Sequence, residues 1–339
     1  MKTLLVTEGG LLTTIQDCGR AGIQAFGVPV CGAMDTYSLR WANKLVGNPQ
    51  TLAGLEMTIK GATLQAMAPL LVAITGADLP ITINGFPEPS WQALHLAAGD
   101  ELAIGSVSRG ARAYLAVMGG VDVPVVMGSR STFLRGHIGG FGGRVLRVGD
   151  VLPIGACEDR GLLAGSFVPS ELRVPLPASV TTVRVMMGPQ DDLFTEAAIL
   201  ELARAEYVVS ADSDRMAYRL QGNPLAHRAG PDIVSDGIAP GSIQVPRSGQ
   251  PIIMLADRQT TGGYAKIATV IGADLPLLGQ TKPGDKIKFA VVSYSEALLL
   301  LRELTTKLHQ PIVPVRGHRT LRVTIDREVF HVRVGELVS

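Results

Sequence analysis

Short apolar segments separated by turns run along most of the chain. Val, Ile, Leu and Thr gather in runs of roughly four to eight residues, and 39 glycines and 21 prolines are scattered between these runs. Gly and Pro interrupt regular structure, so the short apolar runs that they bound are typical of β-strands. The pattern predicts a mainly β protein built from barrels or sandwiches.

Three segments carry the spacing of helices instead. Asp35 can cap a helix that runs to about Val46, where a glycine follows. Asp191 can cap a second helix, and a third is expected from Ser295 to about Leu308. We therefore expect a few short helices among the strands.

Residues 167–178 are expected to join two domains. The stretch is rich in proline, which sustains neither a helix interior nor a central strand, and a new strand follows it from Thr182. At 339 residues, 46% of them hydrophobic, the chain has enough apolar surface for two cores. We expect an N-terminal β-barrel domain over residues 1–170, a C-terminal one over residues 178–308 and a tail over residues 309–339.

One short sequence occurs twice in the chain. Gly76–Pro80 and Gly272–Pro276 are identical, and each is followed by a Gly-Asp pair and an alternating strand. Internal repetition is evidence of duplication. The two copies are therefore expected to take equivalent places in two related β domains.

The tail has the pattern of a hairpin. Apolar and polar residues alternate over Thr320–Ile325 and again over Val329–Val334, on either side of a short polar turn. We interpret it as an exposed appendage without a cofactor role. The alternative is a segment that leads into a biotin-carrying domain, although the chain contains no Met-Lys-Met sequence to which biotin could be attached.

Charge and composition argue against several classes of function. Basic and acidic residues number 31 and 30, and 5% of residues are aromatic, whereas nucleic-acid binding normally needs a basic surface with aromatic rings. Residues 1–8 lack the apolar core of a secretory signal, and no run approaches the ~18 apolar residues of a membrane span. The three cysteines have no C-x-x-C spacing. Reduced thiols, a cytoplasmic location and neither nucleic-acid nor membrane partners are expected.

The densest group of polar residues directly follows a predicted buried strand, Pro251–Leu255. Asp257 is the candidate catalytic carboxylate of this group. The candidate ligand-binding residues are Gln259, Thr260, Thr261, Gly262, Gly263 and Tyr264. A strand end is a rigid position, and glycine allows a ligand to approach the backbone closely. The alternative is a well-bonded loop in which Asp257 and the hydroxyl groups satisfy turn amides.

Polar residues from both halves complete the candidate site. Arg20 and Arg215 can each hold a carboxylate through two hydrogen bonds, and Asp257 can act as a base or orient a water molecule. We assign catalytic roles to Asp257 and Arg215, and substrate-binding roles in the first half to Gln16, Asp17, Arg20 and Asp35. The alternative is that Asp17 and Asp35 cap helices and turns while Arg–Asp pairs fasten the ends of the barrels.

Cofactor motifs are not recognised in the sequence. The chain has no Gly-Lys pair, which a phosphate-binding P-loop requires, so ATP would have to be bound by a partner or in an unfamiliar site. Gly139–Arg144 is either an anion-binding nest or, as we favour, a tight turn. The six histidines have no metal-ligand spacing, so no metal is expected. Cys31 is a weak candidate nucleophile, because no histidine partner is identifiable.

A series of motifs in the same order resembles one protein family over roughly residues 3–300. This is the KipA family, also called allophanate hydrolase subunit 2, the biotin-dependent carboxyltransferase-like family or the C subunit of 5-oxoprolinase. The segments that carry the resemblance are Gly10–Arg20, Gly32–Asp35, Ala42–Asn48, Leu55–Glu56, Thr75–Asp78, Ala116–Asp122, Met127–Thr132, Ser213–Leu220, Gly241–Pro246 and Gln259–Tyr264.

The resemblance implies a fold, an activity and partners. It implies that both domains are open barrels of the cyclophilin-like type. It also implies that the chain works with a KipI-like subunit and a LamB/YcsF-like subunit in the ATP-dependent opening of 5-oxo-L-proline to L-glutamate. Two alternatives stay open: carboxyl transfer from biotin on a separate carrier, as in urea carboxylase, and a non-catalytic module that binds a KipI-like kinase inhibitor.

Overall fold

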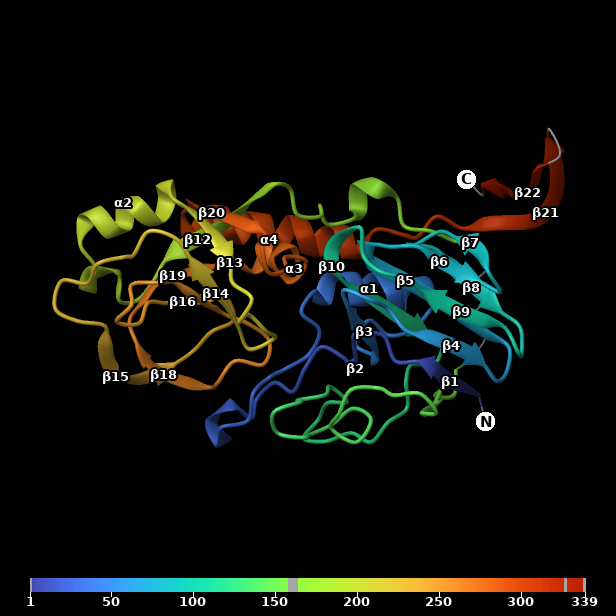
Figure 1. Cartoon of the computed structure of the whole chain (residues 1–339), viewed down its shortest axis with the longest axis horizontal. Helices are drawn as coiled ribbons and strands as arrows, with labels where there is room; N and C mark the ends of the chain where they lie inside the picture. Colours follow the sequence, from blue (N-terminus) through green and yellow to red (C-terminus); the bar gives the residue numbers. More distant parts are fainter. Residues whose placement is uncertain (1, 158–163, 326–327, 338–339) are drawn as a thin grey trace.

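The computed structural model describes residues 2–157, 164–325 and 328–337, and it describes the backbone alone for residues 315–337. Its β-strands form two main bodies that lie side by side along the long axis (Figure 1). The strands of the first body are β1 (Thr3–Glu8), β2 (Leu12–Gln16), β3 (Gly54–Thr58), β4 (Thr63–Ala66), β5 (Leu70–Asp78), β6 (Ile81–Ile83), β7 (Phe86–Glu88), β8 (Ala93–Leu96), β9 (Glu101–Ile104), β10 (Arg109–Val117) and β11 (Val151–Pro153).

Two antiparallel sheets enclose the core of the first body. One sheet has the strand order β11-β1-β4-β9-β6-β7 and the other has the order β2-β3-β10-β5-β8. Leu4 and Leu64 of the first sheet meet Leu55 and Leu115 of the second in one cluster of buried apolar side chains. Removal of this apolar area from water stabilises the pair of sheets.

The helix α1 (Thr36–Leu45) covers the outer face of the second sheet. Trp41 packs with Leu71 of β5, whereas the next residue, Val72, faces the core between the sheets. Successive side chains of a strand point to opposite faces, so both faces of β5 are covered. This explains why the sequence of β5 is almost continuously apolar.

Seven strands of the second body close into a barrel. Their order is β12-β19-β16-β17-β14-β13-β20, and the parallel pair β12–β20 closes the ring. The core contains Val185, Tyr207, Ile253 and Phe289, together with Met34 from the first body. The barrel strands are β12 (Val180–Met187), β13 (Glu206–Val209), β14 (Ala217–Gln221), β16 (Ser242–Gln244), β17 (Ile252–Met254), β19 (Lys266–Val270) and β20 (Lys286–Val291).

The remaining elements surround or connect the two bodies. Among them, β15 (Asp232–Gly237) and β18 (Thr261–Tyr264) pair as a ribbon next to the barrel, and α4 (Tyr294–His309) runs from the barrel to the first body, where Leu308 packs in the cluster of Trp41 (Figure 1). The others are η1 (Gln24–Phe26), η2 (Ser170–Leu172), η3 (Asp191–Leu193), α2 (Glu196–Arg204), η4 (Gly272–Asp274), α3 (Leu275–Gly279), β21 (Val315–Ile325) and β22 (Glu328–Leu337).

The prediction of a mainly β fold is confirmed, and its details differ from the expected pair of open barrels. The barrel of the second body is closed, because β20 pairs with both β12 and β13. The first body consists of two separate sheets packed face to face. Residues of the first core lie between Leu4 and Ile154, and those of the second, apart from Met34, between Val183 and Phe289. We keep a domain boundary at residues 167–178 as a proposal on this basis.

Two of the predicted helices are found with their predicted ends to within one residue. Asp35 caps α1, and α4 begins at Tyr294 after Ser293, whose side chain accepts from the amide of the first turn. The prediction for the second helix is wrong in its cap. Asp191 begins the 3-10 helix η3, and Thr195 caps α2 because its hydroxyl accepts from the Ala198 amide at 3.2 Å. The predicted tail hairpin is found as β21 and β22, and part of its turn, residues 326–327, lies outside the described residues.

The repeated five-residue sequence does not adopt one structure, so the expectation of equivalent places is wrong at the local level. Its first copy ends strand β5, and Gly76 there has a φ of 97°. Its second copy forms η4 and the start of α3, where Asp274 is bound by Arg184 through two-point contacts. The first copy pairs with a neighbouring strand, whereas the second copy is bound by an arginine. These different partners account for the two conformations.

Candidate functional site

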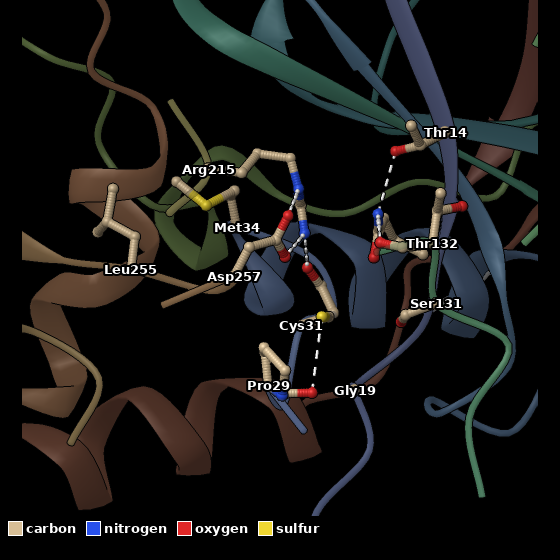
Figure 2. A network of polar contacts seen from close by, with 12 residues as sticks. Thr14, Gly19, Pro29, Cys31, Met34, Ser131, Thr132, Arg215, Leu255 and Asp257 are labelled. Atoms are coloured by element: carbon tan, nitrogen blue, oxygen red, sulfur yellow. Dashed lines mark hydrogen bonds and ion pairs between the residues drawn. The ribbon is translucent and has the colours of Figure 1, made fainter. Parts of the chain in front are cut away.

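Arg215 and Asp257 lie next to each other because the strands beside them pair. Ala217 of β14 faces Met254 of β17 in the barrel, so the residues just before β14 and just after β17 are neighbours. The Arg215 side chain donates two hydrogen bonds to Asp257, from Nε to Oδ2 at 3.0 Å and from Nη2 to Oδ1 at 2.9 Å. Figure 2 shows the two side chains facing each other, with Cys31 beside them. This is the strongest geometry for an Arg–carboxylate pair.

A second carboxylate, Glu56 of β3, approaches Arg215 from the first body. Arg215 Nη1 donates to Glu56 Oε1, and Nη2 donates to the carbonyl of Gly32 at 2.6 Å. Glu56 Oε2 in turn accepts from the Tyr114 hydroxyl at 2.9 Å. Burial lowers the pKa of Arg215. The negative charges of Asp257 and Glu56 outweigh this effect and raise the pKa above its ordinary value. The guanidinium is therefore charged and has carboxylates on both sides.

Arg112 of β10 connects the two bodies beside this pair. Its Nη1 donates to the Tyr218 hydroxyl at 2.8 Å and to the carbonyl of Gly279 at 2.5 Å. Its Nε lies 3.9 Å from Glu56 Oε1. We call the buried group that joins the two bodies the junction network; its members are Glu56, Arg112, Tyr114, Arg215, Tyr218 and Asp257.

Sequence reasoning assigned no role to most of this network. Glu56 and Arg112 are charged residues inside otherwise apolar strands, in the sequences Leu55-Glu56-Met57 and Ala111-Arg112-Ala113. A charge at such a position costs free energy unless a partner compensates it. A charged residue inside an apolar strand therefore indicated that a buried partner exists. The sequence does not say which residue that partner is.

A cavity of about 300 Å³ lies between the two bodies, against the junction network. Arg215 and Asp257 line it together with apolar side chains that include Leu12, Ile59 and Met216. The other charged groups in its lining are paired as well, Arg135 with Asp214 at 2.9 Å and Lys282 with Asp285 at 3.3 Å. Among the described lining residues, every cation thus already has a carboxylate partner.

Asp17 fastens two loops together. Its Oδ1 accepts from Gly19 N at 2.7 Å and from the hydroxyls of Ser129 and Ser131, and its Oδ2 accepts from Arg130 N at 2.6 Å. Both oxygens are thus engaged by the protein itself. This arrangement matches the structural alternative that the sequence left open for Asp17.

Asp35 has a comparable structural position. It is fully buried and accepts from Ser38 N at 2.9 Å, from the Ser38 hydroxyl at 2.6 Å and from Gln280 Nε2 at 2.8 Å. Burial raises its pKa, and the hydrogen bonds from Gln280 and Ser38 act in the opposite direction. Asp35 caps α1 and ties it to the segment after α3, so we do not assign it to a ligand.

Arg20 differs from Arg215 in having few partners. Its side chain is 1% exposed, and Nη2 donates to the carbonyl of Ser131. Among the described residues, its Nε and Nη1 have no hydrogen-bond partner, and neither does Oε1 of the buried Gln16. The amide nitrogen of Gln16 is satisfied by Thr14 Oγ1 and Thr132 O, both at 3.1 Å (Figure 2). The two side chains thus combine bonded atoms with unsatisfied ones.

The predicted ligand-binding loop at Gln259–Tyr264 is mostly a strand. Thr261–Tyr264 forms β18, which pairs with β15, and Thr261 and Tyr264 are exposed there. A Cβ at Gly262 would lie 2.7 Å from both Gln244 Nε2 and Ile238 Cδ1, so these two side-chain ends would have to move to admit one. These residues are not in the lining of the junction cavity. Their role in ligand binding stays a proposal without support from this geometry.

The glycine-rich turn at Gly139–Arg144 uses two of its amides within the protein. Gly140 N donates to Arg130 O at 2.9 Å, and Gly143 N donates to Gly139 O at 2.7 Å. Amides used in this way are not available to hold phosphate oxygens. The favoured interpretation, a tight turn, agrees with this structure.

Cys31 is surrounded by charged groups but remains a thiol. Burial is the largest cause that raises its pKa to about 12, and the negative charge of Asp257 adds to it, while Arg20 and Arg215 act in the opposite direction. Its Sγ lies 3.6 Å from the Pro29 carbonyl (Figure 2). Because the thiolate is the reactive form, this environment gives an unreactive cysteine.

Alkylation at pH 8 tests that conclusion. With a pKa near 12, only ~10⁻⁴ of a thiol is ionised at this pH, so iodoacetamide should leave Cys31 unmodified in the native chain. The exposed Cys157 is the internal control and should react rapidly. Peptide mass spectrometry reads both sites, and modification of Cys31 at the rate of Cys157 would show a reactive thiol instead.

Two other kinds of site are not found in the part of the chain that the structure describes. Within the described ranges, no three His, Cys, Asp or Glu residues are grouped so that they could hold a metal ion. No helix in the same ranges combines the length and the apolar character that crossing a membrane requires.

Comparison with known proteins assigns the chain to a family. The model of the family described as "Carboxyltransferase domain, subdomain A and B" matches residues 26–291. The chain belongs to this carboxyltransferase family. The matched range includes Glu56, Arg112, Arg215 and Asp257, whereas Arg20 lies just before it.

Members of the carboxyltransferase family with different names resemble the chain. It is 39% identical to the C subunit of 5-oxoprolinase from Escherichia coli K12 over 87% of this chain and 93% of that protein, and 38% identical to the protein of the same name from Haemophilus influenzae over 88% and 94%. The crystal structure of the K. lactis urea amidolyase superposes with a TM-score of 0.86 at 30% identity, over 94% of this chain. The chain spans 21% of that much longer chain.

Proposed function

We propose that the chain is the C subunit of an ATP-dependent 5-oxoprolinase, which opens 5-oxo-L-proline to L-glutamate. The observation that carries this proposal is the match to the 5-oxoprolinase C subunits of two bacteria along almost the whole length of both proteins. A KipI-like subunit and a LamB/YcsF-like subunit are the proposed partners. Three free cysteines are consistent with a complex in the reducing cytoplasm.

The junction network supplies the proposed chemistry. Asp257 is held in one orientation by the two hydrogen bonds from Arg215. Each carboxylate oxygen keeps a second lone pair for another donor. In the proposed reaction Asp257 orients a water molecule for attack on the lactam carbonyl carbon, accepts a proton from it and passes this proton to the ring nitrogen as the C–N bond breaks. Arg215 holds Asp257 in position through these two hydrogen bonds.

ATP is proposed to enter the reaction on the partner subunits. The one glycine-rich turn considered as a phosphate site, Gly139–Arg144, uses its amides internally. No step in this chain is therefore assigned to the nucleotide. The role of ATP is to supply the free energy that makes the stable lactam bond open.

Carboxyl transfer is a second candidate function, because a urea amidolyase has the same fold over 94% of this chain. In that enzyme, however, the matched part is about one fifth of the molecule, at 21% of its length. The two candidates differ in substrate and in product. A complex assayed with 5-oxoproline or with urea and a biotinylated carrier protein separates them, since only one of the two reactions yields glutamate.

The purified chain alone is expected neither to hydrolyse ATP nor to open 5-oxoproline, whereas addition of both partner subunits should produce both activities. Phosphate release and glutamate formation are the measurements, and the partner pair without this chain is the control. Turnover by the single chain would overturn the subunit proposal. Partners that form glutamate equally well without this chain, yet bind it, would identify it as a non-catalytic binding module.

A further inference from the structure

Arg20 is a buried cation whose hydrogen-bonding capacity is mostly unused. Its side chain is 1% exposed, yet Nε and Nη1 have no partner. A buried donor without an acceptor costs free energy, so native proteins rarely keep one unless a ligand or water completes it. Oε1 of Gln16, also buried, lacks a donor. Both side chains bond to the segment Ser131–Thr132, which places an unused donor pair and an unused acceptor in one region.

Arg20 has no direct ion pair among the described residues, and the carboxylate of Asp17 binds the hydroxyl of Ser131, whose carbonyl accepts from Arg20. Arg20 and Arg215 both act on the Cys31 thiol, as does Asp257. Arg215 is neutralised by its two-point contact with Asp257. Arg258, which also acts on Cys31, donates to the carbonyls of Ile238 and Leu255 and has no carboxylate within 4.0 Å among the described residues. Two buried guanidinium groups therefore lack a direct anionic partner.

Arg20 lies beside an exposed loop. The backbone of Arg20 donates to Val30 O at 2.8 Å, so the arginine lies at the base of the loop that these two residues delimit. The only regular turn of that loop, η1, has no buried residue, and Phe26 on it is 82% exposed. The loop projects away from both bodies (Figure 1).

We infer that Arg20 anchors the carboxylate of a small carboxylate-bearing amide, whose N–H is accepted by Gln16 Oε1. This inference rests on the proposed function, and it names the carboxylate as the substrate group that Arg20 recognises. The cavity at the junction network is a poorer anchor, because each cation in its described lining already has a carboxylate within 4.0 Å, including Arg112, whose Nε lies 3.9 Å from Glu56 without a hydrogen bond. A bound carboxylate would give Arg20 the direct anionic partner that it lacks, with the amide on the side of Cys31 and Asp257.

The first test compares a ligand with and without the carboxylate. The reconstituted complex is titrated in a calorimeter with 5-oxoproline and with 2-pyrrolidinone, which has the same lactam ring without the acid group. Wild type should bind 5-oxoproline, and Arg20→Met should weaken this binding ~10–100-fold, as expected for loss of a charged hydrogen-bonded pair. Binding of 2-pyrrolidinone should be weak and insensitive to the substitution. Arg109→Met, at a 61% exposed arginine paired with Asp78, is the matched control.

Thermal unfolding separates a ligand role from a structural one. Removal of an unsatisfied buried charge should leave the Tm of the ligand-free Arg20→Met chain unchanged or higher. A large fall in Tm would show that Arg20 instead stabilises the fold through its hydrogen bond to Ser131. Arg20→Lys keeps the charge but not the two-point geometry, and it should bind 5-oxoproline with intermediate affinity.

Failure of this inference can be told from failure of the proposed function. If the complex opens 5-oxoproline and Arg20→Met leaves KM unchanged, the anchor is wrong and the function stands. Acetate, compared with chloride at equal ionic strength, tests the anion site without the lactam. A rise of Tm with acetate that Arg20→Met abolishes supports the site even if the complex does not turn over 5-oxoproline. No such rise, together with Arg20-independent binding of 5-oxoproline, overturns it.

Discussion

Arg215→Met is expected to lower the free energy of unfolding of the chain by ~3–5 kcal/mol, because it leaves two buried carboxylates without their shared cation. Asp257 and Glu56 are 7% and 1% exposed and meet on Arg215 from the two bodies of the fold. Neither carboxylate can turn to water without loss of the packing between the bodies. Urea-induced unfolding, followed by circular dichroism, gives the free energy directly.

A surface arginine provides the control for this measurement. Arg247 forms its ion pair with Asp232 at 85% exposure, and Arg247→Met should change stability by less than ~0.5 kcal/mol. If Arg215→Met costs no more than Arg247→Met, the junction network does not hold the two bodies together. Adding Glu56→Gln to Arg215→Met should recover part of the loss, since one of the two uncompensated charges is then removed.

Asp257→Asn is expected to reduce kcat of the reconstituted complex ~100-fold or more, the usual effect of removing a positioned proton acceptor. The substitution keeps the size of the side chain and leaves Arg215 with Glu56 as its remaining carboxylate partner. The variant should therefore fold and join the complex. Glutamate formation measures the activity, with unfolding and gel filtration recorded in parallel.

Asp78→Asn is the matched control, since this aspartate is 54% exposed and pairs with Arg109 away from the junction. Its complex should turn over at the wild-type rate. If the complex with Asp257→Asn also retains near-normal turnover, Asp257 has no catalytic role. Failure of this variant to join the complex would instead make the residue part of an interface.

The strands, two helices and the cap at Asp35 followed from local sequence because they depend on neighbours along the chain. The apolar runs, the glycines and the cap at Asp35 each act over a few residues. The miss at Asp191 has the same origin, since Thr195, a residue of similar capping strength, stands four positions later. The ribbon strand β18 was missed because its pairing with β15 spans distant residues in a polar, glycine-containing sequence.

The sequence predicted which types of residue form the candidate site. It did not predict which of these residues form ion pairs with each other. Arg20 and Arg215 were equivalent in the sequence as possible carboxylate ligands. The difference between them comes from partners far away in the chain: Arg215 meets Glu56, 159 positions away, whereas Arg20 meets only the Ser131 carbonyl, 111 positions away. The buried charges Glu56 and Arg112 signalled that a compensating network must exist, but only the fold shows which groups form it.

The most direct test of the proposed site is the structure of the reconstituted complex with bound 5-oxoproline. The expected result is a ligand next to Cys31, with its carboxylate within hydrogen-bond distance of Arg20 Nε or Nη1 and its lactam facing Asp257. A ligand enclosed by the partner subunits alone, with no contact to Arg20, Gln16 or Asp257, would contradict the proposal that these three residues hold the substrate.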